Sequence, residues 1–202
     1  MVASSWHELG VRAAILAPLA LALGCSIGEG TGEIGGPVVA SDFCGLEEPD
    51  YQLYPSFFTA QVTGTALDMR VQRGSALEAY ADGLFIHVRD TNEVRRQRIG
   101  LPIPLDGEHT SLVQMSFYLN ETCEAGFPSD HRRRAVVLEA VGGTITFDAI
   151  YAPDIDAGAT GIEATLTDVE LIDAETPAER HATLSGWFSF FYQRGAPAQR
   201  FP

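Results

Sequence analysis

Apolar side chains recur at every second residue through much of this chain, and this period-two pattern constrains the fold more than any other feature. Side chains alternate between the two faces of a β-strand, so the pattern predicts strands with one buried face. The segments end at Gly, Pro, Asp and Asn, which favour turns. The clearest of them cover residues 57–66, 84–88, 113–119, 162–171 and 182–192.

No window beyond residue 24 sustains the apolar stripe of an amphipathic helix. About eight short strands at regular intervals therefore predict an all-β protein, built as an antiparallel β-sandwich. Pro102 and Pro104 suit open edge strands, which favours the sandwich, and a β-barrel is the alternative. A single domain over 42–202 is expected, because about 160 residues suffice for one core.

Two segments are predicted to contain breaks between strands. Residues 94–105 follow a turn and are expected to form a return strand, interrupted by their prolines. The Gly142–Gly143 pair is expected to separate a strand over 135–141 from a second one over 145–151. Both expectations rest on local sequence alone.

One strand is predicted to be irregular. The apolar residues of 162–171 change phase halfway, so that the first and second halves would face opposite sides of a regular strand. A one-residue bulge near Thr167 or Asp168 would reconcile the two halves. Residues 75–80 are ambiguous and are compatible with a single helical turn.

The N-terminal region has the features of an export signal. Residues 13–24 form an apolar run after Arg12, too short to span a bilayer, which needs about 20 residues. The run ends in Leu-Ala-Leu-Gly-Cys-Ser over residues 21–26. This ending resembles the lipobox of bacterial lipoproteins, in which a small residue precedes an invariant Cys. The resemblance implies a signal peptide over 1–24 and a mature chain that begins at an acylated Cys25; a buried helix ending in a free cysteine is the alternative.

The lipobox resemblance also implies a location in the cell envelope. Several acyl chains anchor a protein stably, since each buried CH₂ contributes about 0.8 kcal/mol. Ser26 stands where an Asp would retain a lipoprotein at the inner membrane, which points by resemblance to the outer membrane. Residues 25–41 are then predicted to be the lipidated Cys and a glycine-rich, flexible tether. The overall layout resembles uncharacterised β-rich lipoproteins of GC-rich Gram-negative bacteria.

Cys44 and Cys123 are the two remaining cysteines. Export would place them in an oxidising compartment, where an even pair usually forms a disulfide, so we predict a Cys44–Cys123 bond. Two buried free thiols are the alternative. The chain has no Cys-x-x-Cys motif, which disfavours a redox or zinc role.

The net charge of −14 argues against a nucleic-acid partner, because an acidic protein repels a polyanion. Arginines cluster only at residues 95–98 and 132–134. These clusters are candidates for binding lipopolysaccharide phosphates or an acidic partner. Their alternative role is that of ordinary charged residues on exposed strand ends.

Two further groups of residues are candidates for binding. Trp187 and Phe191 share one face of the last strand, and they form either a surface that binds a glycan or protein, or a face covered by a loop or the tether. Asp154 and Asp156 precede a glycine in an arrangement that weakly resembles part of a calcium loop. An acidic hairpin loop is the alternative, so no metal and no cofactor are expected.

No set of residues in the sequence has the pattern of a catalytic site. The chain lacks the Gly-x-Ser-x-Gly elbow of a serine hydrolase, and its histidines fall in strands or loops without such a motif. The sequence therefore favours a membrane-anchored lipoprotein that acts as a non-enzymatic structural or binding module of the cell envelope. A hydrolase of envelope polymers is the alternative.

Overall fold

The computed structural model describes residues 26–74, 81–123 and 136–192. Over these residues the chain folds into one eleven-stranded sheet. The strands are β1 (Ser26–Gly28), β2 (Gly30–Ala40), β3 (Leu46–Leu53), β4 (Phe57–Thr63), β5 (Ala66–Gln72), β6 (Gly83–Val88), β7 (Pro102–Pro104), β8 (Val113–Leu119), β9 (Val136–Ala149), β10 (Thr160–Ile172) and β11 (Arg180–Tyr192). The short helices are α1 (Ser41–Cys44), α2 (Thr91–Glu93) and the π-helix η1 (Val94–Arg98).

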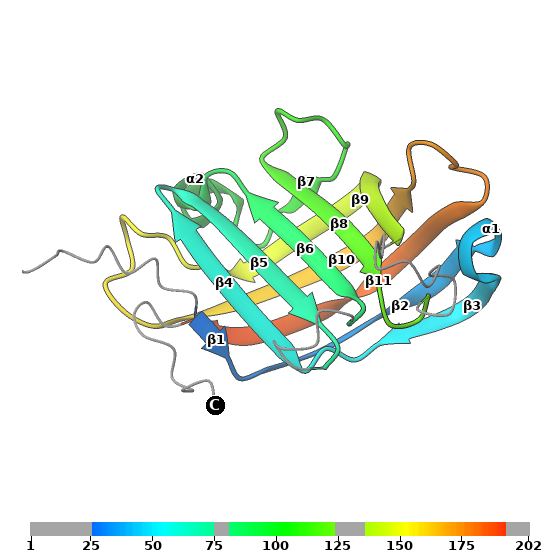
Figure 1. Cartoon of the computed structure of the whole chain (residues 1–202). Coiled ribbons are helices and arrows are strands. Elements are labelled where there is room, and N and C mark those ends of the chain that lie inside the picture. The colour runs from blue at the N-terminus through cyan, green and yellow to red at the C-terminus, as the bar shows by residue number, and fades with distance from the viewer. Residues whose placement is uncertain (1–25, 75–80, 124–135, 193–202) are drawn as a thin grey trace, which may run out of the picture.

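The sheet is antiparallel throughout and curls on itself. Its strand order is β1-β4-β5-β6-β8-β9-β10-β11-β2-β3, with β7 paired to β9 beside this path. Only Glu29 separates β1, at one end of this path, from β2, which lies next to its other end. In Figure 1, β4, β5, β6 and β8 cross in front of β9, β10 and β11. The predicted all-β antiparallel class is confirmed.

The arrangement of the sheet lies between the two predicted alternatives. A sandwich has two sheets, whereas here one continuous sheet bends until its halves face each other across the core, as the wall of a barrel does. Long strands with bulges and glycines can bend in this way. The enclosed core consists of inward side chains, and its largest fully buried members are Phe58, Phe117, Phe147, Tyr151, Phe188 and Tyr192.

The predicted tether over 25–41 is wrong for the part that the structure describes. Residues 30–40 form β2, which pairs with β11 on one side and with β3 on the other. The glycines are needed for close packing rather than for flexibility: a Cβ on Gly30 would lie 2.5 Å from the Cβ of Phe190. Sequence composition predicted flexibility because β11, which pairs with β2, lies far away in the chain.

The predicted return strand over 94–105 is also wrong for its first half. The Asp90 carboxylate accepts the backbone N–H groups of Asn92 and Glu93, at 3.0 and 3.1 Å, and thereby caps α2. The helical path continues into η1, where Val94 is buried. Only Pro102–Pro104 forms a strand, β7, which pairs with β9 alone, as prolines at a sheet edge require.

The Gly142–Gly143 pair does not separate two strands, because β9 runs through it without a break. Gly143 has a φ of +82°, and a Cβ there would lie 2.3 Å from the carbonyl oxygen of Asp168 on β10. The β10 register shifts between Leu166 and Val169, and Asp168 has a φ of +46°. The bulge predicted near Thr167 or Asp168 is therefore confirmed, and the glycine pair makes room for it. The helical turn considered for 75–80 lies outside the described residues.

Arg180 connects α1 to the hairpin that β10 and β11 form through ion pairs. The Arg180 guanidinium lies 2.6 Å from an Asp42 oxygen and 2.9 Å from an Asp173 oxygen, and 5.3 Å from the centre of the Phe43 ring. Its hydrogen bonds lower the pKa of Asp42. Burial opposes ionisation of Asp173, but hydrogen bonds from the Glu175 backbone and from Arg180 still hold its pKa below the usual range.

The predicted disulfide is confirmed. Cys44 and Cys123 are bonded, and their Cα atoms lie 5.3 Å apart. Cys44 ends α1, whereas Cys123 follows β8, so the bond joins the first strands of the chain to the middle of the sheet. Cys123 is fully buried.

Candidate functional site

The outer face of β11 carries two large aromatic side chains in an exposed position. Side chains on β11 alternate between the core and the outside: Phe188 and Phe190 are buried, while Trp187 is 44% and Phe191 53% exposed. The N-terminal segment pairs beside β11 as β2 rather than covering this face. Trp187 and Phe191 are therefore not covered by a loop or by the N-terminal segment within the described residues. Their exposure is compatible with a binding surface.

A third exposed ring lies two strands across the sheet from Trp187. Tyr54, 58% exposed, follows the last residue of β3, where Leu53 pairs with Ile34. The preceding residue of β2, Glu33, pairs with Trp187. Tyr54 and Trp187 therefore flank Glu33, since neighbouring strands are about 4.8 Å apart.

Carboxylates alternate with these rings. Ser189 stands between Trp187 and Phe191 on β11 and pairs with the exposed Glu163 of β10. We call Tyr54, Trp187 and Phe191, together with Glu33 and Glu163, the aromatic face. Exposed rings can stack on sugar rings or cover cationic groups, and carboxylates accept hydrogen bonds from hydroxyls. The aromatic face thus has the chemistry of a binding surface.

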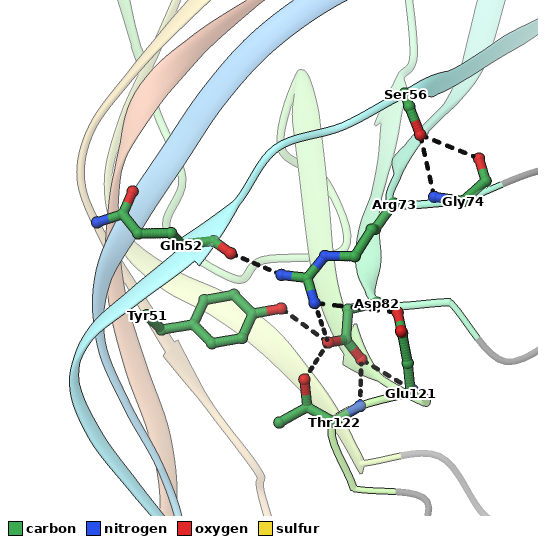
Figure 2. A network of polar contacts seen from close by, with 8 residues as sticks. All are labelled: Tyr51, Gln52, Ser56, Arg73, Gly74, Asp82, Glu121 and Thr122. Carbon is green, nitrogen blue, oxygen red and sulfur yellow. Dashed lines mark hydrogen bonds and ion pairs between the residues drawn. The ribbon is translucent and has the colours of Figure 1, made fainter.

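A buried carboxylate organises the region where β3 meets the chain after β5 and after β8 (Figure 2). Asp82 is fully buried and accepts hydrogen bonds from the Tyr51 hydroxyl at 2.8 Å and from the backbone N–H groups of Glu121 and Thr122 at 2.9 and 3.1 Å. The Thr122 hydroxyl also donates to it. The Arg73 guanidinium lies 4.0 Å from one Asp82 oxygen. We call these five residues the Asp82 cluster.

The Asp82 cluster has the properties of a structural hydrogen-bond network rather than of a reactive site. Both Asp82 oxygens already accept hydrogen bonds. Burial, and then the negative charge of Asp82, raise the pKa of Tyr51, so that its phenol stays protonated. Burial likewise raises the pKa of Tyr118 to about 12, and its hydroxyl donates to Gln72 at 3.0 Å. The cluster therefore joins β3 to the chain just after β5, just before β6 and just after β8.

The histidines do not assemble a catalytic set within the described part of the chain. His87 Nδ1 lies 2.6 Å from an Asp68 oxygen, and both side chains are about one-third exposed on the outer wall of β5 and β6. Ser116, on the next strand, donates its hydroxyl to Glu139 at 2.9 Å. His181 lies on β11, His109 follows β7, and His131 is outside the described residues.

The two weak metal candidates serve to hold a loop together. Asp154 accepts a hydrogen bond from the Asn92 side chain at 2.9 Å, and Asp156 accepts one from the Ala152 N–H at 2.9 Å. Arg95 lies 3.9 Å from Asp156. In the three described ranges, no group of three or more His, Cys, Asp or Glu side chains is placed to hold a metal ion.

The lipidation site Cys25 and the arginines at 132–134 lie outside the described residues, whereas those at 95–98 belong to η1. The described residues contain no helix that is long and apolar enough to cross a membrane.

Sequence reasoning missed the Asp82 cluster and Tyr54. Nothing in the neighbourhood of Asp82 distinguishes it from other acidic turn residues, because its partners come from segments distant in the sequence. Tyr54 follows a strand with the period-two pattern and could have been assigned to the outer face by that alternation.

Compared with known proteins, the chain matches no family model, no curated protein and no solved structure.

Proposed function

We propose that this chain is a lipid-anchored, non-enzymatic binding module of the bacterial cell envelope, and that the aromatic face is its contact surface. The observation that carries the proposal is the exposure of Trp187, Phe191 and Tyr54, because the other aromatic rings on the described strands are buried or half-buried. Exposed apolar groups gathered on one face are typical of binding surfaces. Rings interleaved with carboxylates suit an envelope glycan, which offers both C–H faces and hydroxyl groups.

Lipid anchorage is tested by the mass of the mature chain. Protein extracted from membranes of a Gram-negative host is expected to begin at Cys25 and to carry acyl chains on that residue. A Cys25→Ser variant is expected to stay unprocessed and to lose the acyl mass. In lipoproteins the cysteine thiol is lipidated before the signal peptide is cleaved. An unmodified chain that begins at Met1 would contradict the proposal.

The aromatic face is tested by replacing Trp187. The Trp187→Ser variant is expected to change the free energy of unfolding by about 1 kcal/mol or less, because the side chain is 44% exposed. Its apparent affinity for purified peptidoglycan sacculi, measured by co-sedimentation of the detergent-solubilised protein, is expected to fall about ten-fold, in line with the loss of one ring contact.

The adjacent Phe188 provides the matched control, because it points into the core from the same strand. Phe188→Ala is expected to cost about 3–5 kcal/mol of stability, as large-to-small changes of buried aromatics do. If Trp187→Ser destabilises the protein as much as Phe188→Ala, the ring is structural. If the wild-type protein does not sediment with sacculi, peptidoglycan is not the ligand.

A hydrolase of envelope polymers is the second candidate, and the His87–Asp68 pair favours it. A carboxylate that holds an imidazole in place is one part of a general-base arrangement. Release of soluble fragments from sacculi by the wild-type protein, but not by a His87→Gln variant, would favour this candidate over a binding module.

A further inference from the structure

The structure leaves little chain between the proposed anchor and the folded sheet. Ser26, which directly follows Cys25, already pairs with Ala60 of β4. One residue spans at most about 3.6 Å, so acyl chains on Cys25 would hold the start of β1 at the bilayer surface. The side of the fold that lies next to this point must then meet the lipid headgroups.

The α2–η1 segment lies at the same end of the sheet as the start of β1. β1 is antiparallel to β4, so Ser26 is the residue of β1 nearest to the end of β4 at Thr63. The next turn includes Thr65, whose carbonyl oxygen accepts the N–H of Thr91 at 2.9 Å, and Thr91 begins α2. Figure 1 shows β1 and α2 at one end of the molecule.

Internal hydrogen bonds make this end one unit. Asn92 exchanges two hydrogen bonds with Asp154, at 2.9 and 3.3 Å, which join α2 to the loop over 153–159. Arg95 lies 3.9 Å from Asp156 of the same loop. Asp90 caps α2, so these three carboxylates are engaged within the unit.

The outward side chains of this end combine arginines with apolar residues. Arg96 and Arg98 are exposed on η1 of a chain whose net charge is −14. Leu101 is 50% and Ile155 44% exposed beside them. We call Arg96, Arg98, Leu101 and Ile155 the arginine rim.

We propose that the arginine rim lies against the anionic headgroups of the bilayer that holds Cys25. This proposal rests on the lipid anchorage of the proposed function and adds the orientation of the fold. Guanidinium groups bind phosphates in a bidentate manner, and the apolar side chains fit the boundary between headgroups and acyl chains. The other, more acidic surfaces are repelled by anionic lipid, which favours the same orientation.

The proposed orientation has a consequence for the aromatic face. Trp187 lies near the middle of β11 and Tyr54 just after β3, away from the arginine rim. Phe191 pairs with Gly161 near the 153–159 loop, so it lies at the membrane end of the aromatic face. With the rim on the membrane, the wall of the curled sheet stands upright on the bilayer. Trp187 and Tyr54 are then accessible to a polymer beside the membrane.

Spin labels on the lipidated full-length protein test the orientation. One label is placed at Ile155→Cys in the rim and another at Ala178→Cys, an exposed residue in the turn at the far end of β10. In the acylated protein the native cysteines are blocked by the lipid and the disulfide, so each label is unique. The protein is reconstituted into phosphatidylglycerol vesicles that contain a nickel-chelating lipid, and the relaxation enhancement of each label is measured.

The label at residue 155 is expected to show at least several-fold stronger relaxation enhancement than the label at residue 178. An Arg96→Glu/Arg98→Glu variant is expected to lose the preference, since each arginine near an anionic surface contributes about a five-fold factor and the pair roughly 25-fold. Arg70→Glu, a charge reversal on the exposed wall of β5, should leave the preference intact.

Two outcomes would overturn the orientation: equal relaxation of both labels in protein whose acylation is confirmed by mass, or an equal effect of Arg70→Glu and the rim variant. Circular dichroism of each variant verifies that the sheet is folded. Absence of acyl chains on Cys25 would instead contradict the proposed function, so the two failures are distinguishable.

Discussion

Replacing both Cys44 and Cys123 by serine is expected to lower the free energy of unfolding by about 4 kcal/mol. The disulfide closes a loop with a sequence separation of 79, and a cross-link over such a loop strongly restricts the unfolded chain. Urea unfolding of the wild-type and Cys44→Ser/Cys123→Ser proteins, followed by circular dichroism, measures the difference. A larger m-value in the variant is expected as well, because its unfolded state is less compact.

Reduction provides an independent control for this prediction. Wild-type protein unfolded in the presence of a reductant should have the same transition midpoint as the serine variant. If neither reduction nor substitution moves the midpoint, the bond contributes nothing to stability and the prediction is wrong.

Replacing Asp82 by alanine is expected to cost about 3–5 kcal/mol of unfolding free energy, the range measured when one partner of a buried charged network is removed. The substitution would leave the Tyr51 hydroxyl, the Thr122 hydroxyl and two backbone N–H groups without their acceptor, and would remove one of the two carboxylates that lie near Arg73. Thermal and urea unfolding of the variant measure the loss.

Two milder variants separate this explanation from a simple loss of volume. Tyr51→Phe removes one hydrogen bond and is expected to cost about 1 kcal/mol. Asp68→Asn, which changes a carboxylate on the exposed wall, is expected to cost less than about 1 kcal/mol. If Asp82→Ala lowers the free energy of unfolding no more than Asp68→Asn does, the Asp82 cluster does not stabilise the fold in the way proposed.

The disulfide and the Asp82 cluster are not expected to act independently. Thr122 binds Asp82, and the next residue, Cys123, carries the disulfide. Neighbouring interactions of this kind give non-additive effects in double-mutant cycles. Together they fix the chain after β8 to α1, β3 and β5.

The sequence by itself determined the elements whose pattern is local. Alternating apolar residues predicted β4, β6, β8, β10 and β11, because the two faces of a strand alternate whatever the tertiary arrangement. The phase change in β10 predicted the bulge at Asp168, since only an extra residue can return the second half to the core. The leftover cysteine pair predicted the disulfide from redox compartment alone.

Tertiary structure decided everything that depends on distant partners. The glycine-rich β2 is a strand because β11, which follows it by about 150 residues of chain, supplies its hydrogen bonds and packs Phe190 over Gly30. Residues 94–98 are helical because Asp90 caps the turn before them, a contact that outweighs their strand-like pattern.

The same distinction between local pattern and distant partners applies to the candidate site. The position of Trp187 and Phe191 on one strand face could be read from the sequence, because it follows from alternation. Their exposure could not, since it depends on where the N-terminal segment packs, and this segment pairs at the edge of β11 instead of covering its face. The role of Asp82 could not be predicted from the sequence for the same reason. A buried carboxylate is stable only with its hydrogen-bond donors, and these come from three separate segments that the curled sheet brings together.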